Sequence, residues 1–308
     1  MQINRRQMLG MMAAGSAGLL CPQLITSELA FAAFPDLSVV KGPDPAACVR
    51  EAVKGQGGMS HFVSKGDVVV IKPNMGFGNP PSWASSTEPA VMRALAELAL
   101  QAGAKRVMIF DNPCGKVSQA LEQCGIQARV KDLHDTFVFI AREERFFRSV
   151  ELPKAKVLTK TEIAKDILEA DTIINVPIAK SHGSAMVTFG MKNWMGVVRD
   201  RRPFHAHYNL HQAIADMATF IKPKLTVLDA TRALVTGGPG GPGQVQLLQT
   251  IVAGTDVVAL DAYATTMAKW SDKGYRPDEI PYIVNAYKMG LGRMSLDQLN
   301  ISKTTLTA

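Results

Sequence analysis

The chain has 308 residues, a hydrophobic content of 47% and a formal net charge of +7. This composition is typical of a globular protein, and the length fits one large α/β domain or two small ones. The basic residues are spread along the chain and aromatic residues make up only 6% of it, which argues against nucleic-acid binding. A modest positive excess favours anionic ligands.

Residues 1–32 have the pattern of an export signal. The adjacent Arg5 and Arg6 precede an uncharged stretch at 8–24, and the Ala-Phe-Ala triplet at 30–32 has the A-x-A form that signal peptidase cleaves. Paired arginines are typical of leaders that the twin-arginine translocase reads, and this pathway carries folded cargo. We therefore expect a twin-arginine signal peptide and export of the folded protein to the periplasm.

The leader has two other interpretations. An ordinary export signal that happens to contain two arginines is one alternative. Cys21 suggests a lipoprotein, but the bulky Leu20 stands where a small residue is needed, and we reject this interpretation. The stretch is less apolar than a membrane anchor, which needs roughly 20 strongly apolar residues, and no later segment is apolar enough to serve as a stable anchor. Residues 33–308 are expected to be a single α/β domain with a charge of about +6, because the leader contributes +1.

Three cysteines follow the leader: Cys48, Cys114 and Cys124. They show no C-x-x-C spacing, so no intrinsic iron–sulfur cluster is expected. In an oxidising compartment Cys114 and Cys124 could form a disulfide, and buried structural thiols fit the sequence equally well.

Strands and helices alternate along the chain. Residues 67–71 predict a buried strand, and the turn-forming residues at 72–78 predict a loop. Thr87 is the expected N-cap of a helix that ends at Gly103, and 106–110 predicts the next strand. This order of strand, helix and strand predicts a right-handed βαβ unit on a parallel sheet.

The alternation continues downstream, with helices expected over 163–170, 209–221 and 256–270 and strands over 172–176, 225–228 and 248–252. Strands of this type are buried on both faces, so the predicted fold class is α/β, with a parallel or mixed sheet between helix layers. The charged section at about 125–165 fits this pattern less well, and we expect an inserted subdomain or an antiparallel flap.

Polar side chains stand where several predicted strands end. Ligands collect at the carboxyl ends of strands in open α/β sheets, so convergence of these residues predicts a ligand site. Taken alone, Lys72 would be interpreted as a solvated surface lysine. Because Lys180 and His182 stand at an equivalent strand end, we instead assign Lys72 to the ligand site. The clusters are Lys72 to Asn74, Asp111 with Asn112, Pro177 to Gly183, and Asp229 to Thr231.

The stretch 180–211 is the densest in basic side chains: Lys180, His182, Lys192, Arg199, Arg201, Arg202, His205, His207 and His211, with Asn193 among them. Such a cationic set can clamp a phosphate or carboxylate. His182, His205 and Lys180 are the candidate catalytic groups, with either histidine as general acid–base. Candidate ligand-binding residues are Lys72, Asn74, Lys192, Asn193 and Asp229. A basic solvated loop is the alternative.

Histidine spacing also raises the question of a metal site. His205, His207 and His211 are candidate ligands, because His207 and His211 share a helix face if their helix begins early. A helix capped by Asn209 would instead leave His207 outside it.

The glycine-rich run at 237–243 matches neither a P-loop nor a dinucleotide fingerprint. Close approach of its backbone to a ligand and a mobile lid both remain open.

The chain resembles the DUF362 family of uncharacterised proteins, some of which carry ferredoxin-like iron–sulfur modules. The resemblance covers about residues 65–265 and rests on Val-Ile-Lys-Pro-Asn at 70–74, Thr-Glu-Pro at 87–89, 103–107, 175–182, Met-Lys-Asn-Trp-Met-Gly at 191–196, the region of His205, 228–230, the glycine loop and 253–256. The chain lacks the cysteine-rich module, so the resemblance implies no electron transfer by a cluster of its own. The family has no agreed activity, and the resemblance therefore implies a domain rather than a reaction.

A fainter likeness rests on the order of elements along the chain: a strand is followed by Lys-x-His, then by a lysine and then by a histidine. It resembles the nickel-cofactor lactate racemase group, in which lysine and histidine hold a nickel-bearing pincer nucleotide and other histidines move protons. The corresponding positions would be Lys180, His182, Lys192 and His205.

We expect an exported enzyme, or a folded redox accessory protein, that binds an anionic small molecule or cofactor at the strand ends. Folded export fits a metal ion or an organic cofactor loaded before translocation. The alternatives are a non-catalytic accessory or maturation protein for an exported enzyme complex, and a metal-binding protein. The expected partners are the twin-arginine translocase during export and a redox partner protein.

Overall fold

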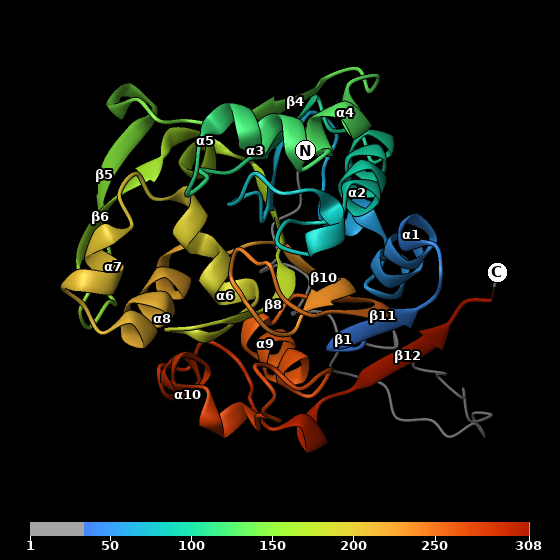
Figure 1. Cartoon of the computed structure of the whole chain (residues 1–308). Coiled ribbons are helices and arrows are strands. Elements are labelled where there is room, and N and C mark those ends of the chain that lie inside the picture. Colours follow the sequence, from blue (N-terminus) through green and yellow to red (C-terminus); the bar gives the residue numbers. More distant parts are fainter. Residues whose placement is uncertain (1–33, 308) are drawn as a thin grey trace, which may run out of the picture. The chain divides into compact units, whose positions relative to one another are not determined.

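A mixed sheet of ten strands is the centre of the part of the chain that the structure, a computed structural model, describes: residues 34–307 (Figure 1). The predicted leader lies outside these residues. The sheet strands are β1 (Leu37–Lys41), β2 (Val68–Pro73), β3 (Arg106–Phe110), β4 (Thr136–Phe139), β7 (Thr172–Val176), β8 (Ile178–His182), β9 (Met186–Thr188), β10 (Leu225–Leu234), β11 (Val245–Gly254) and β12 (Ile301–Thr305).

Eight strands follow the order β12-β1-β11-β10-β7-β2-β3-β4, and β8 joins the sheet by pairing with β10 and β9. Neighbours from β10 to β4 are parallel, whereas β11 is antiparallel to both β1 and β10. The predicted α/β class with a mixed sheet is confirmed. So is the predicted βαβ unit, because β2 and β3 are parallel neighbours joined through one α-helix.

Helices cover both faces of the sheet. They are α1 (Pro45–Gly55), α2 (Pro89–Gln101), α3 (Val117–Gln123), α4 (Ile126–Val130), α5 (Lys165–Glu169), α6 (Gly190–Asn193), α7 (Arg202–Ala206), α8 (Leu210–Phe220), α9 (Val257–Thr265) and α10 (Pro281–Lys288). Successive strand residues point to opposite faces. In β2, Val69 and Ile71 pack into the core under α1 and α2, and Val70 packs into the core under α8, α9 and α10. Among the described residues, no helix is long and apolar enough to cross a bilayer.

The helix starts confirm one predicted cap and correct another. Asn209 caps α8 as expected, because its side chain accepts a hydrogen bond from Gln212 N at 3.0 Å. The predicted cap Thr87 is wrong, since α2 is capped by Glu88. The Thr87 hydroxyl accepts from Asn74 N at 2.8 Å and donates to Val176 O at 2.9 Å. It therefore ties the loop after β2 to the end of β7.

Several predicted element boundaries are also wrong. Residues 163–170 contain the end of β6 and the short α5 rather than one helix, and α9 ends at Thr265 rather than at 270. The predicted loop at 72–78 starts later, because Lys72 and Pro73 belong to β2. β8 was not expected, since its polar sequence does not read as a buried strand. β10 and β11 each have ten residues and extend well beyond the predicted strands.

The section at 125–165 is divided between two sheets. β4 is parallel to β3 at the edge of the central sheet. β5 (Phe147–Glu151) and β6 (Lys160–Ala164) form a separate antiparallel pair, which fits the expected flap. Asp216 of α8 holds the β5–β6 connection, since its carboxylate accepts the amide N–H of Lys156, Val157 and Leu158 at 2.8 to 3.0 Å.

The Asp216→Asn variant tests this attachment. An amide nitrogen would face backbone donors in place of a carboxylate oxygen, so we expect a loss of about 1–3 kcal/mol in the free energy of unfolding. Amide hydrogen exchange at residues 156–158 should accelerate, whereas the exposed Asp297→Asn control should change neither quantity. Unchanged exchange at 156–158 would show that the carboxylate does not hold this connection.

Candidate functional site

A cavity of about 170 Å³ lies at the carboxyl ends of β2, β3 and β8. The structure brings together here seven residues that the sequence predicted for one site. They come from β2 and its following loop, from β8, and from the segment 190–206. These residues are Lys72, Asn74, Lys180, His182, Lys192, Asn193 and His205, and the lining also contains Asp111, Arg201, Cys114, Thr188, Phe77 and Met195.

Lys72 and Asp111 form a buried ion pair at the base of the cavity, with 3.0 Å between Lys72 Nζ and Asp111 Oδ1. Both residues are 1% exposed. Lys72 Nζ also donates to Pro73 O at 2.6 Å and to Asn193 Oδ1 at 2.9 Å, so all three ammonium donors are used. Burial lowers the pKa of Lys72, and the neighbouring carboxylate opposes that shift. A Cβ at Gly196 would collide with both charged groups, so this position requires glycine.

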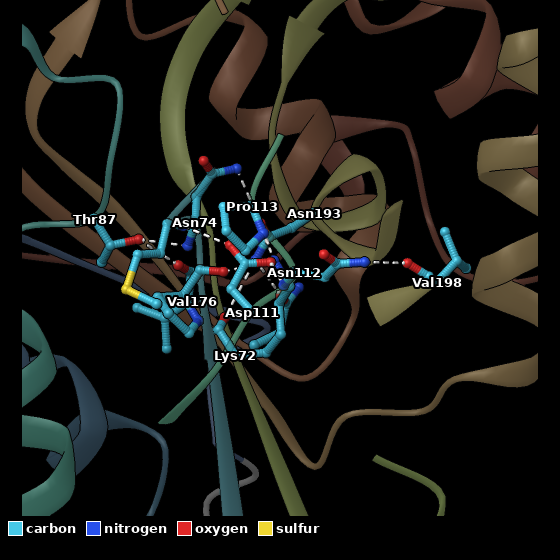
Figure 2. A network of polar contacts seen from close by, with 12 residues as sticks. Lys72, Asn74, Thr87, Asp111, Asn112, Pro113, Val176, Asn193 and Val198 are labelled. Atoms are coloured by element: carbon cyan, nitrogen blue, oxygen red, sulfur yellow. Dashed lines mark hydrogen bonds and ion pairs between the residues drawn. The ribbon is translucent and has the colours of Figure 1, made fainter. Parts of the chain in front are cut away.

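A chain of side-chain amides connects this ion pair to Lys180. Figure 2 shows Lys72, Asn193 and Asn74, where the chain begins. Asn193 Oδ1 accepts from Lys72 and from Asn74 Nδ2 at 3.1 Å, and its amide nitrogen donates to Asn175 Oδ1 at 2.9 Å. Asn74 Oδ1 in turn accepts from Lys180 Nζ at 3.0 Å. The hydrogen-bond partners therefore fix the orientation of each amide, and α6 is held against the end of β2.

Lys180 is buried without a carboxylate partner. Its ammonium donates to Ser85 O at 2.6 Å and to Asn74 Oδ1, and lies 4.8 Å from the centre of the Phe77 ring. Burial, and then the charge of Lys192, lower the pKa of Lys180 to about 7. Neutral acceptors and an aromatic face stabilise a cation less than a carboxylate does.

Lys192 lies on α6 and is 8% exposed. Asp261 fixes this short helix by accepting the N–H of Gly190 at 2.7 Å and of Met191 at 3.0 Å. Within residues 34–307, Lys192 Nζ makes no hydrogen bond or ion pair of its own. Burial lowers its pKa to about 8, and the nearby cation of Arg201 contributes. Lys192 is therefore a mostly buried residue that lines the cavity and whose ammonium has no partner among the described residues.

His182 lines the same cavity as a neutral side chain. Its Nδ1 accepts a hydrogen bond from Ala185 N at 3.1 Å, so the ring proton is assigned to Nε2. Burial, and then the charge of Lys192, lower the pKa of His182 to about 3. The ring of His205 is stacked beside it, with 6.2 Å between centroids and 5° between planes. In the free protein His182 is therefore a hydrogen-bond donor, and a bound anion would be needed to raise its pKa for proton transfer.

Asp229 does not line the cavity. This buried carboxylate accepts Glu88 N at 2.7 Å and the hydroxyl of Thr231 at 2.7 Å, so it positions the start of α2. Burial raises its pKa to about 6. The predicted strand end was too early, because β10 continues to Leu234.

The three candidate metal ligands have different surroundings. His205 stacks on His182, His207 is exposed, and His211 stacks on the Tyr282 ring. Across residues 34–307, no group of three or more His, Cys, Asp or Glu side chains is placed to hold a metal ion. These histidines therefore do not form a ligand set in this structure.

Within residues 34–307, Cys48, Cys114 and Cys124 are free, so of the two alternatives for Cys114 and Cys124 the disulfide is not formed. Cys48 and Cys124 are buried, as structural thiols would be, and Cys114 is exposed at the mouth of the cavity. Cys114 Sγ accepts from Arg201 Nη1 at 3.1 Å. Cys114 was not predicted for the site, although it follows the strand-end residue Asp111 by three positions.

A second, larger pocket of about 800 Å³ adjoins the cavity and shares Cys114, Arg201 and His205 with it. Its lining has four arginines: Arg142, Arg199, Arg201 and Arg202. Two of them are paired with acids, Arg199 with Glu162 and Arg202 with Asp200. The pocket beside the cavity is therefore basic.

The glycine run packs against other loops of the site. Gly238 N donates to Ser181 Oγ at 3.1 Å, and a Cβ at Gly238 would collide with the Ser181 backbone. Asn79 Nδ2 donates to Gly240 O at 2.7 Å, and Pro239 lines the cavity. These glycines therefore let their backbone come close to Ser181 of β8 and to Asn79, beside the cavity.

The fold and the site define an α/β domain with a lysine-lined cavity at its strand ends. The chain belongs to the family described as a domain of unknown function, DUF362, whose sequence model matches residues 69–266. One relative is the thylakoid-associated protein sll1697 of Synechocystis sp., which is 30% identical over 254 residues, covering 80% of this chain and 75% of the relative.

Two solved structures are more distantly similar. The lactate racemase apoprotein from Thermoanaerobacterium thermosaccharolyticum has a TM-score of 0.48 and 14% identity, with 74% of this chain and 57% of that chain covered. A protein from Thermotoga maritima has a TM-score of 0.40 and 12% identity, with 60% and 51% covered. The chain spans a little over half the length of both proteins. Both scores are below 0.5, which is too low to establish a shared fold.

Replacement of two cavity lysines by methionine should have opposite effects on stability. Lys72→Met leaves Asp111 buried without a partner and should lower the free energy of unfolding by about 3–5 kcal/mol. Lys192→Met removes a buried, unpaired cation and should raise it by about 1–3 kcal/mol at pH 6.

The gain from Lys192→Met should shrink as the pH rises. Between the folded pKa of about 8 and the usual value near 10.5, the unfolded wild-type chain binds more protons than the folded one, so wild-type stability increases. Urea unfolding at pH 6 and pH 9 measures both effects. Equal destabilisation by the two variants would contradict the assigned difference between these lysines.

Proposed function

We propose that the protein binds a small molecule through a carboxylate or phosphate group in the strand-end cavity. The supporting observation is its imbalance of charge. Lys72, Lys180, Lys192 and Arg201 line the cavity, and among the described lining residues the single carboxylate is Asp111, which is already paired with Lys72. A buried ammonium without a counter-charge is costly, and a bound anion supplies that counter-charge.

The groups available to an anion are donors. Lys192 Nζ and the Nε2–H of His182 both belong to the lining and are not used by other described residues. Charge-assisted hydrogen bonds from such donors are roughly twice as strong as neutral ones. A cavity of about 170 Å³ holds only the head of a larger ligand, whose remainder would extend into the arginine-lined pocket.

Sulfate binding tests this proposal, because sulfate keeps its charge throughout the useful pH range. The affinity should fall as the pH rises from 7 to 9, since Lys180 and Lys192, with pKa values of about 7 and 8, lose their protons. Lys192→Gln should weaken binding about tenfold or more, a loss of about 1.4 kcal/mol. Isothermal titration calorimetry measures both effects.

The exposed Lys269→Gln variant is the control, because it makes the same chemical change away from the cavity. Its sulfate affinity should equal that of the wild type. Binding that Lys192→Gln leaves unchanged, or that strengthens with rising pH, would contradict the proposed site.

We also propose that residues 1–32 direct export of the folded protein to the periplasm by the twin-arginine pathway. The paired Arg5 and Arg6, the weakly apolar stretch and the Ala-Phe-Ala triplet support this proposal. A ligand-binding cavity built from segments far apart in the sequence forms only on folding, so loading in the cytoplasm would require folded export.

Replacement of both Arg5 and Arg6 by lysine should keep the charge but abolish export. Fractionation and the size of the processed chain measure the outcome. Arg276→Lys, outside the leader, should leave export unchanged. Normal export of the double variant would support an ordinary signal peptide instead.

A further inference from the structure

The three cavity lysines differ in what surrounds their ammonium nitrogens. Lys72 has three oxygen acceptors, one of them a carboxylate. Lys180 has two oxygen acceptors and the face of the Phe77 ring. Among the residues that the structure describes, Lys192 has no such acceptor. Imine formation removes both hydrogens of the neutral amine, so Lys192 is the lysine that can react without losing internal hydrogen bonds.

We propose that Lys192 Nζ forms an imine with the carbonyl carbon of a small anionic aldehyde or ketone bound in the cavity. This inference rests on the anion-binding function proposed above and specifies the class of ligand. A lysine becomes nucleophilic when it is desolvated or placed next to another cation, because both conditions favour the neutral amine. Lys192 meets both conditions, since it is 8% exposed and the positive charges of Arg201 and Lys72 act on it.

The protonation state of Lys192 agrees with this geometry. Its lowered pKa of about 8 gives a fraction of neutral amine near neutral pH, whereas an ordinary lysine has almost none. Lys180 has an even lower pKa, but its nitrogen is held by Ser85 O and Asn74 Oδ1. The guanidinium of Arg201, which also lines the cavity, can attract the carboxylate or phosphate of the ligand.

The step is a condensation that needs no oxidant or reductant. The lone pair of Lys192 Nζ attacks the carbonyl carbon, and the electrons of the carbonyl π bond move to oxygen. The nitrogen gives up two protons to that oxygen, which leaves as water while the C=N bond forms. Amine and carbonyl compound thus become imine and water. His182, with its proton on Nε2, can donate a hydrogen bond to the carbonyl oxygen as negative charge develops there.

Reductive trapping tests the proposal. The full chain is incubated with pyruvate or dihydroxyacetone phosphate, reduced with cyanoborohydride and digested for peptide mass spectrometry. Acetone and dihydroxyacetone are the matched uncharged probes. We expect a reduced adduct on Lys192 with the two anionic probes, loss of most of that adduct with the uncharged ones, and competition by sulfate.

Variants separate covalent reaction from anion binding. Lys192→Arg keeps the positive charge but cannot form an imine, so it should lose the adduct and retain sulfate binding. The exposed Lys269→Arg control should keep both. An adduct on Lys180, or adducts spread over surface lysines equally in wild type and Lys192→Arg, would overturn the proposal. No adduct with intact sulfate binding overturns the imine alone, and absence of both overturns the proposed function as well.

Discussion

The buried ion pair between Lys72 and Asp111 is the contact on which the cavity depends. It joins the ends of two adjacent parallel strands, and Asn193 extends the contact to α6. Two desolvated charges are stable only when their remaining hydrogen-bonding capacity is satisfied. The backbone supplies this, since Met75 N and Asn112 N donate to the carboxylate at 2.6 and 2.9 Å. Because the pair uses the carboxylate of Asp111, the neighbouring cations are left without a counter-charge.

The uncompensated cations give the cavity its chemical character. Burial disfavours the charged forms of Lys180, Lys192 and His182, and it lowers the pKa of all three. The cavity therefore holds groups whose protonation a ligand can change. An anion favours protonation of the lysines, and a carbonyl group can react with the neutral amine of Lys192. The same arrangement lowers the stability of the free protein, as is common at functional sites.

The sequence was sufficient to predict the convergence of the site but not its contacts. Repeated strand–helix units imply that strand ends meet at one edge of a sheet, so residues as distant as Lys72 and Lys192 were assigned to one site. The sequence does not say which hydrogen bonds a polar residue makes across the fold. Thr87 was therefore expected to cap a helix that Glu88 caps. Asp229 was expected at a strand end, although β10 continues past it to Leu234. The Asp229 carboxylate accepts a hydrogen bond from the N–H of Glu88, at the start of α2.

Proton uptake on anion binding tests the central claim most directly. Sulfate titrations at pH 8, in buffers with different heats of ionisation, measure the number of protons taken up per anion bound. If Lys192 is a buried cation that lacks a counter-charge, the anion should raise its pKa above about 8, and the wild type should take up protons. The uptake should fall in Lys192→Arg, whose guanidinium is always charged. Binding without proton uptake, or equal uptake by wild type and variant, would contradict the account.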